Sequence, residues 1–174
     1  TESPEHRVRI TRPFYLRVSE VTQAEYECVM GNNPAHFQGA PIRPMDNVSW
    51  KQASTFCRKL DELAQENASR SGHRLPTEAE WEKASRGTDG RRWPWGDTFD
   101  ESRCIVWDYA MAIDVTTMPV DAHPVGASPY GVEQMAGNVE EWVEDAFRPY
   151  PGSTHQSPSA SGELRVLRGG SWFF

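Results

Sequence analysis

One stretch of the chain decides its fold class: RLPTEAEWE, residues 74–82. Pro76 biases the residue before it towards an extended backbone, so the chain turns sharply at this point. Thr77 and Glu80 form a capping box, in which each side chain accepts a hydrogen bond from the other residue's backbone N–H. The sequence therefore predicts a helix that begins after Thr77 and is anchored in the core by Trp81.

Two further capping boxes predict two further helices. Thr22 and Glu25 open a short helix. Ser49 and Gln52 open a longer one, in which apolar residues recur close to the helical period. A glycine, the residue favoured just past a helix C-terminus, is expected to end each of the three helices: Gly31, Gly72 and Gly87.

The rest of the chain is rich in turns and loops. Short alternating stretches predict strands at residues 6–10, 14–18 and 164–167. Residues 87–131 contain mostly turn signals, and their tryptophans favour an ordered loop region because large aromatics have much area to bury. Residues 149–162 are rich in Ser, Pro and Gly and predict an exposed loop. We therefore expect one α+β domain over residues 1–174.

Composition excludes several functional classes. With 18 basic and 25 acidic residues, the net charge is −7, which argues against nonspecific nucleic-acid binding. No apolar run approaches the ~18–20 residues that span a bilayer, and no signal peptide is visible. The first residue is not Met, so we expect a fragment of a longer or processed chain. The cysteines lack CxxC spacing and are expected to be buried or free thiols: Cys28, Cys57 and Cys104.

Several sequence blocks follow one another in a specific order: EVT (20–22), VSW (48–50), RLPTEAEWE (74–82), WPWGD (93–97), ASPYGV (127–132), MAGNV (135–139) with EW (141–142), and RVLRGGSW (165–172). Together they resemble the formylglycine-generating enzyme or sulfatase-modifying factor family. The resemblance implies a C-type-lectin-like α+β fold, with few helices and short antiparallel strands, in which the N- and C-terminal strands share a sheet. Family members continue beyond the last block, so the chain is expected to lack their C-terminal segment.

The resemblance also implies where catalytic chemistry would lie. Family enzymes oxidise a sulfatase cysteine with copper held by two cysteines just after the Gly-Gly-Ser-Trp block. Phe174 stands where the first of these is expected, and a phenyl ring cannot ligate copper. Related sulfoxide synthases use an iron site, and the scattered histidines here contain no matching cluster. We expect no catalytic residue and no copper. The alternative is a formylglycine-generating oxidoreductase whose catalytic cysteines belong to the missing C-terminal segment.

Calcium is the cofactor that the resemblance favours. The family's site uses a side-chain oxygen three residues before a glycine, backbone carbonyls and a Glu. In this chain the corresponding residues are Gln134, the carbonyls of Gly137 and Val139, and Glu141. Oxygen-only ligation suits Ca²⁺, although the family usually has Asp or Asn at the first position. The alternative is a solvated, acidic helix start around Glu141, where carboxylates are favoured without any metal.

Two departures from the family pattern concern the same region. Glu140 stands where the family has a tryptophan, which puts the family's groove contact in doubt. A second family calcium site would need an Asn where Cys104 or Ile105 stands, followed by an Asp such as Asp114. Because the Asn is missing, we do not expect that site.

A non-catalytic copy of this fold can still present a binding surface. The variable proteins of diversity-generating retroelements in bacteria and phages have the same fold. In the genes for these proteins, the codons around and after the Gly-Gly-Ser-Trp block change. Adjacent phenylalanines there fit such a history and are a plausible hot spot. The alternatives are that they pack into the core, or that the chain is a sensor or scaffold module of a larger protein. We predict a display module that recognises a protein or peptide ligand through Trp172, Phe173, Phe174, Arg168 and Trp95.

Overall fold

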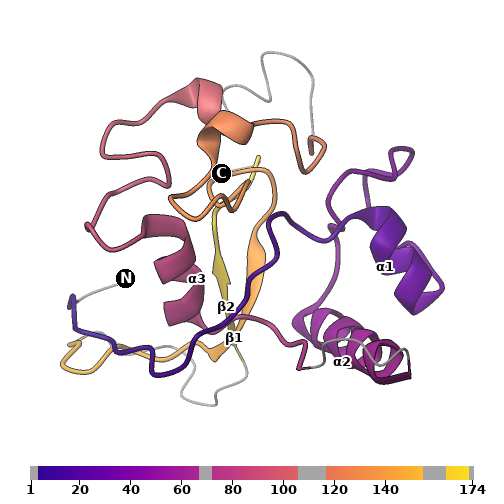
Figure 1. Ribbon diagram of the computed structural model, residues 1–174, viewed down its shortest axis with the longest axis horizontal. Helices are drawn as coiled ribbons and strands as arrows, with labels where there is room; N and C mark the ends of the chain where they lie inside the picture. Colours follow the sequence, from indigo (N-terminus) through magenta and orange to yellow (C-terminus); the bar gives the residue numbers. More distant parts are fainter. Residues whose placement is uncertain (1–3, 67–71, 106–116, 155–163, 173–174) are drawn as a thin grey trace.

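Helices and one pair of strands form the frame of the molecule. The computed structural model describes residues 4–66, 72–105, 117–154 and 164–172. Its elements are α1 (Gln23–Met30), α2 (Trp50–Glu66), α3 (Glu78–Arg86), the 3₁₀ turns η1 (Glu101–Arg103) and η2 (Pro124–Gly126), and the strands β1 (Glu141–Ala146) and β2 (Arg165–Arg168). Figure 1 shows α3 on one side of the strands and α1 and α2 on the other. The predicted α+β class is confirmed.

All three predicted helices are present, and each begins where its capping box places it. At α3, the backbone N–H of Thr77 donates to Glu80 Oε2 at 2.8 Å. At α2, the backbone N–H of Ser49 donates to Gln52 Oε1 at 2.9 Å. Arg74 adds two contacts of 2.7 Å to the carboxylate of Glu80, and these lower the pKa of Glu80 to about 2. The segment before α3 is thereby tied to the first turn of the helix.

The two strands run antiparallel. Glu141 lies opposite Arg168 and Trp142 opposite Leu167, with an irregularity between Trp142 and Ala146. Strand β2 falls where a C-terminal strand was predicted. Glu141 therefore begins a strand whose backbone pairs with β2, and the alternative of an acidic helix start is wrong.

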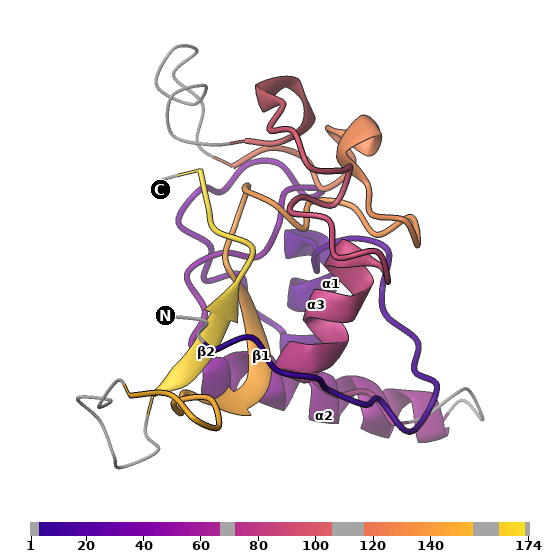
Figure 2. The ribbon, with the colours of Figure 1, turned by 90° about the vertical axis from the view of Figure 1, so that its left-hand side faces the viewer.

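The strands predicted at residues 6–10 and 14–18 are not formed in the described residues. Figure 2 shows the N-terminal stretch, in indigo, passing beside the sheet. It is held by other contacts: the ring of His6 packs edge-on against Tyr150 at 4.6 Å, and the carbonyl of Val18 accepts from the N–H of Glu133 at 2.7 Å. Alternation favours an extended backbone, but a strand also needs a neighbouring backbone edge. The implied N-terminal strand of the sheet is thus absent from the part described.

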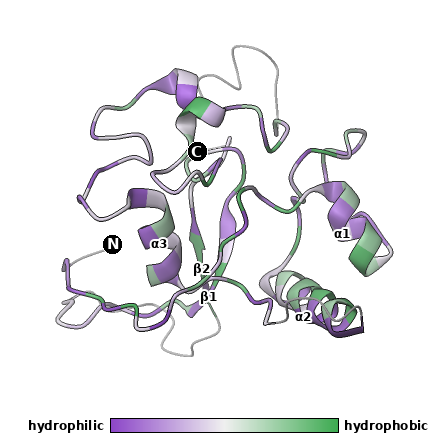
Figure 3. Cartoon of the chain, in the orientation of Figure 1, coloured by the Kyte–Doolittle hydropathy of each residue, from purple (hydrophilic) through white to green (hydrophobic). Residues whose placement is uncertain are grey.

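Two apolar clusters form the core. One lies between α3 and the strands and the other between α1 and α2; their buried members are Trp81, Ala84, Val132, Met135 and Val143, and Tyr26, Ala35, Met45 and Phe56. Two indoles connect them, because Trp50 Nε1 donates to the carbonyl of Val143 at 2.8 Å and Trp142 Nε1 to that of Val48 at 2.9 Å. Apolar residues take up only part of each helix (Figure 3). None of the helices in the described ranges is long and apolar enough to cross a membrane.

Candidate metal centre and ligand surface

Asn138 is the fixed point of the candidate site. Its side chain is 0% exposed; Nδ2 donates to Glu20 Oε2 at 2.7 Å and Oδ1 accepts from the N–H of Met118 at 2.9 Å. Its own N–H donates to the carbonyl of Ile105 at 3.1 Å, and its carbonyl accepts from the N–H of Trp172 at 3.0 Å. One side chain and its backbone therefore hold together four segments that are distant in sequence.

Gly137 lets the same turn lie directly against Ile105. The two residues form a parallel bridge, and the N–H of Gly137 donates to the carbonyl of Gly169 at 2.9 Å. The φ angle of Gly137 is 90°, and a Cβ at this position would lie 2.1 Å from the carbonyl oxygen of Ile105. Both the backbone angle and the close approach require a glycine.

The predicted calcium ligands lie along this turn and the start of β1. Gln134 is 4% exposed, and neither its amide oxygen nor its amide nitrogen has a hydrogen-bond partner in the described structure. The carboxylate of Glu141 accepts from Trp81 Nε1 at 3.0 Å. The Val139 carbonyl oxygen and the Trp81 ring lie 3.8 and 3.5 Å from the point where a Gly169 Cβ would stand. The unsatisfied amide, the carboxyl group and the backbone carbonyl all belong to residues 134–141.

Two carboxyl groups in this region resist ionisation. Burial raises the pKa of Glu20 well above its ordinary value, and the charge of Glu141 raises it further. Burial raises the pKa of Glu141 to about 7, and the hydrogen bond from Trp81 offsets this only in part. Raised carboxyl pKa values mark a place where added positive charge is favourable. From the sequence, Glu20 stood out only as part of the EVT block and not as a site residue, because its partner Asn138 lies 118 positions away.

Within the described ranges, no three His, Cys, Asp or Glu side chains gather where they could hold a metal ion. All three cysteines are free, as predicted. Burial raises the pKa of the Cys104 thiol to about 11, so the free thiol is protonated at neutral pH. Cys104 and Ile105 are both buried, whereas Asp114 lies outside the described residues.

Trp172 is the centre of the candidate ligand surface. Its ring is partly exposed and packs edge-on against Phe37, with ring centroids 5.4 Å apart and planes at 80°. Phe37 in turn packs edge-on against His36 at 4.6 Å. The predicted contacts Phe173 and Phe174 lie outside the described residues. Phe37 escaped sequence reasoning because no local pattern connects it with the C-terminal block.

Arg168, another predicted ligand contact, lies below the surface. Its side chain is 10% exposed, 3.5 Å from Glu78 Oε1 and 3.7 Å from Glu82 Oε2. The guanidinium group stands 5.2 Å from the centre of the Trp81 ring. Arg168 therefore ties β2 to α3 in this structure.

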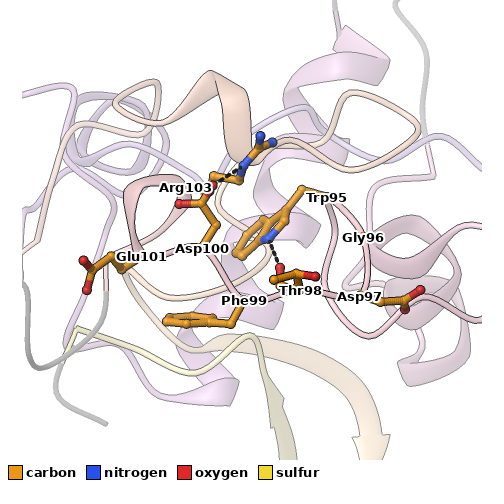
Figure 4. Close-up of a pocket in the computed structure, with 8 residues that line it drawn as sticks. All are labelled: Trp95, Gly96, Asp97, Thr98, Phe99, Asp100, Glu101 and Arg103. Atoms are coloured by element: carbon orange, nitrogen blue, oxygen red, sulfur yellow. Dashed lines mark hydrogen bonds and ion pairs between the residues drawn. The ribbon is translucent and has the colours of Figure 1, made fainter.

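Trp95, the last predicted contact, belongs to the loop between α3 and η1. Its ring stacks on Trp93 at 5.8 Å, and its Nε1 donates to the carbonyl of Thr98 at 3.0 Å. This loop borders a pocket of about 560 Å³ (Figure 4). Most of the lining residues are aromatic or charged; the lining consists of Trp95, Gly96, Asp97, Thr98, Phe99, Asp100, Glu101 and Arg103.

The model of one known family matches the whole chain. Residues 1–174 match the model described as the sulfatase-modifying factor enzyme 1-like domain. The chain is 33% identical over 181 residues to a hercynine oxygenase of Mycobacterium tuberculosis, covering 97% of this chain and 37% of that protein. It is 38% identical over 150 residues to a formylglycine-generating enzyme of Streptomyces coelicolor, covering 77% of this chain and 43% of that protein. The chain thus spans less than half the length of either relative.

Comparison with solved structures agrees. Treponema denticola variable protein 1 superimposes with a TM-score of 0.72 at 31% identity, over 89% of this chain and 72% of that one. The similarity therefore extends from the motifs to the arrangement of the helices and strands.

Proposed function

Because the chain belongs to the sulfatase-modifying factor enzyme 1-like family, we propose that it is a non-catalytic binding module of that family, which recognises a protein or peptide ligand. The observation that supports this most is the placement of Trp172. Its backbone N–H donates a hydrogen bond to the carbonyl of the buried Asn138, while its ring lies partly exposed against Phe37. Aromatic rings on a fixed frame suit recognition because little conformational entropy is lost when they bind.

Likeness to a protein named as variable supports a diversified surface. The codons for Phe173 and Phe174 follow Trp172 directly, where variable proteins of this fold would change. The gene itself tests this point. A near-identical template repeat, with adenines at the positions of these codons, would support diversification, and its absence from the genome would remove diversification from the proposal.

Panning tests the binding role. The immobilised chain is screened against a library of random peptides, and enriched peptides are measured on variants. We expect Trp172→Ala and Phe37→Ala each to weaken binding about tenfold or more, as for central aromatic hot spots. Tyr130→Ala is the control, because this exposed aromatic contacts Lys83 of α3 instead. Enriched peptides that bind all three variants equally well would exclude the Trp172 surface.

We also propose a structural calcium ion on the same frame. The side-chain oxygen of Gln134, the carbonyls of Gly137 and Val139 and the carboxylate of Glu141 would hold it. The fit is supported by the buried amide of Gln134, which lacks any described partner, and by the raised pKa of Glu141. Among residues 4–66, 72–105, 117–154 and 164–172, no backbone N–H outside the helices and strands donates to the carbonyls of Gly137 or Val139. A bound Ca²⁺ would supply the positive charge that this turn lacks and would fix its shape.

Calcium removal is expected to lower thermal stability. With Ca²⁺ at 100 times its dissociation constant, the gain is about 3 kcal/mol, or roughly 5–10 °C in the melting temperature. Glu141→Gln should abolish the response to EDTA and, in EDTA, be at least as stable as the unaltered chain because it removes a desolvated charge. Glu140→Gln is the matched control, since its side chain is exposed. Melting curves of the unaltered chain that coincide with and without EDTA would remove calcium from the proposal.

A second candidate function is enzymatic, and the names of the two curated relatives favour it. In this alternative, a longer chain supplies the copper-binding cysteines and oxidises a sulfatase cysteine to formylglycine. The test is aldehyde formation on a cysteine-containing sulfatase peptide, with copper and oxygen present. Turnover by the 174-residue chain itself would overturn the non-catalytic proposal.

A further inference from the structure

We propose that the pocket beside Trp95 binds an arginine side chain of the peptide ligand. This inference rests on the proposed function, because it names the chemistry of the ligand that the module recognises. We call this hollow the acidic aromatic pocket, and its lining runs from Trp95 to Glu101 with Arg103. Its volume of about 560 Å³ is in the range of small-ligand sites and exceeds what one side chain fills, so neighbouring peptide backbone fits as well.

Aromatic rings provide the first half of the chemistry. Trp95 stacks on Trp93 at 5.8 Å with 9° between the planes, and Phe99 leans on the same Trp93 at 5.0 Å and 55°. The hydrogen bond from Trp95 Nε1 to the carbonyl of Thr98 fixes the orientation of the indole. Phe99 is 46% exposed, so it is accessible to a ligand. A fixed, electron-rich ring face attracts a guanidinium group placed over it.

Negative charge provides the second half. The lining carries Asp97, Asp100 and Glu101 against a single cation, Arg103. Arg103 is already engaged, since its Nε contacts Asp100 Oδ2 at 2.9 Å and its Nη1 donates to the carbonyl of Val125 at 2.7 Å. Glu101 is exposed and has no ion-pair partner among the described residues. Figure 4 shows Glu101 and Asp97 on opposite sides of the two aromatic rings.

Asp97 is less free than Glu101 but still contributes charge. Its Oδ1 accepts from the backbone N–H of Arg92 at 3.1 Å, and its charge acts on Arg91. Arg91 is itself paired with Asp89 at 2.6 Å. The pocket therefore retains an excess of negative charge, which disfavours an anion.

A guanidinium group matches this combination better than other groups do. It stacks on aromatic faces and donates in a planar fork to carboxylates, whereas the ammonium group of lysine is a compact, strongly hydrated charge. An uncharged apolar group would cover the rings but would remove water from the carboxylates without compensation. The rings and Glu101 together thus favour arginine.

The test uses the 174-residue chain and a blocked tripeptide, Gly-Arg-Gly. Its control replaces arginine with citrulline, which keeps the shape and loses the charge. Binding is followed by NMR on the indole N–H signals, with Trp95→Phe identifying the signal of Trp95. We expect a saturable shift of that signal with the arginine peptide, and binding of the citrulline peptide about tenfold weaker or absent. The affinity should fall as salt rises from about 0.05 to about 0.5 M.

Two charge-neutralising variants complete the design. Glu101→Gln should weaken binding of the arginine peptide about threefold or more. Glu27→Gln removes the same charge from the exposed face of α1 and should leave binding unchanged. Equal binding of the citrulline peptide, or equal effects of the two variants, would overturn the arginine site. Because the readout is Trp95 and a synthetic peptide, this outcome is separate from failure of the Trp172 surface in panning.

Discussion

Replacing Gly137 with alanine is expected to destabilise the protein by about 4–5 kcal/mol or to prevent folding. The new Cβ would lie 2.1 Å from the Ile105 carbonyl oxygen, so the two backbone segments must separate by roughly 1 Å to restore ordinary contact. Such a movement strains the hydrogen bonds from Gly137 to Gly169 and from Asn138 to Ile105. Alanine also disfavours the φ angle of 90° found here. Urea denaturation followed by tryptophan fluorescence measures the loss.

A matched glycine separates the two causes. Gly90 has a φ angle of 76°, but a Cβ there would meet nothing within 4 Å. Gly90→Ala therefore carries only the backbone penalty of about 1 kcal/mol. If the two alanine variants lose the same stability, close contact with Ile105 is not the reason that glycine is required.

Replacing Asn138 with alanine is expected to cost about 3–5 kcal/mol. The change removes the hydrogen bonds to the buried Glu20 carboxyl group and to the partly buried backbone N–H of Met118, and both groups lose this partner. A buried polar group that loses its partner costs about 1–3 kcal/mol. Thermal and urea unfolding of the variant measure the sum.

Asn47→Ala is the control for that change. Asn47 also has a positive φ, 55°, and one side-chain hydrogen bond, to the carbonyl of Pro34, but its side chain is exposed. We expect a loss of about 1 kcal/mol there. A cost at Asn138 no larger than at Asn47 would show that the buried network contributes little.

Local signals made the helices predictable. A capping box fixes a helix start through residues three positions apart, and the boxes at Thr22, Ser49 and Thr77 each mark the observed start. The predictions that were wrong depended on residues distant in the sequence, which local signals do not report. Residues 6–10 alternate like a strand, yet pairing depends on a distant edge that sequence alternation does not encode. The acidic run that begins at Glu140 suits a helix start, but the backbone from Glu141 onwards pairs with β2 and forms a strand.

The site was predictable in part. The resemblance named Gln134, Gly137, Val139 and Glu141 as ligands; the structure places the first three before β1 and Glu141 at its first residue, and their role in holding a metal stays a prediction. The sequence did not predict which face of β2 is buried. Leu167 is exposed, while the charged Arg168 is largely buried against two glutamates. Hydropathy alone predicts the reverse, and the acidic residues of α3 together with the Trp81 ring help to make it favourable.

The contacts of Asn138 have a consequence for heritable variation. At Ile105, Met118 and Trp172, Asn138 forms hydrogen bonds only with backbone N–H and carbonyl groups, which every residue other than proline supplies. The partly exposed side chains of Met118 and Trp172 can therefore be exchanged without altering these hydrogen bonds, whereas Ile105 is fully buried and its side chain is also held by packing. The frame thus depends on one buried amide and not on the partly exposed side chains that surround it. Substitutions in the surrounding loops can therefore change the surface while the frame stays the same.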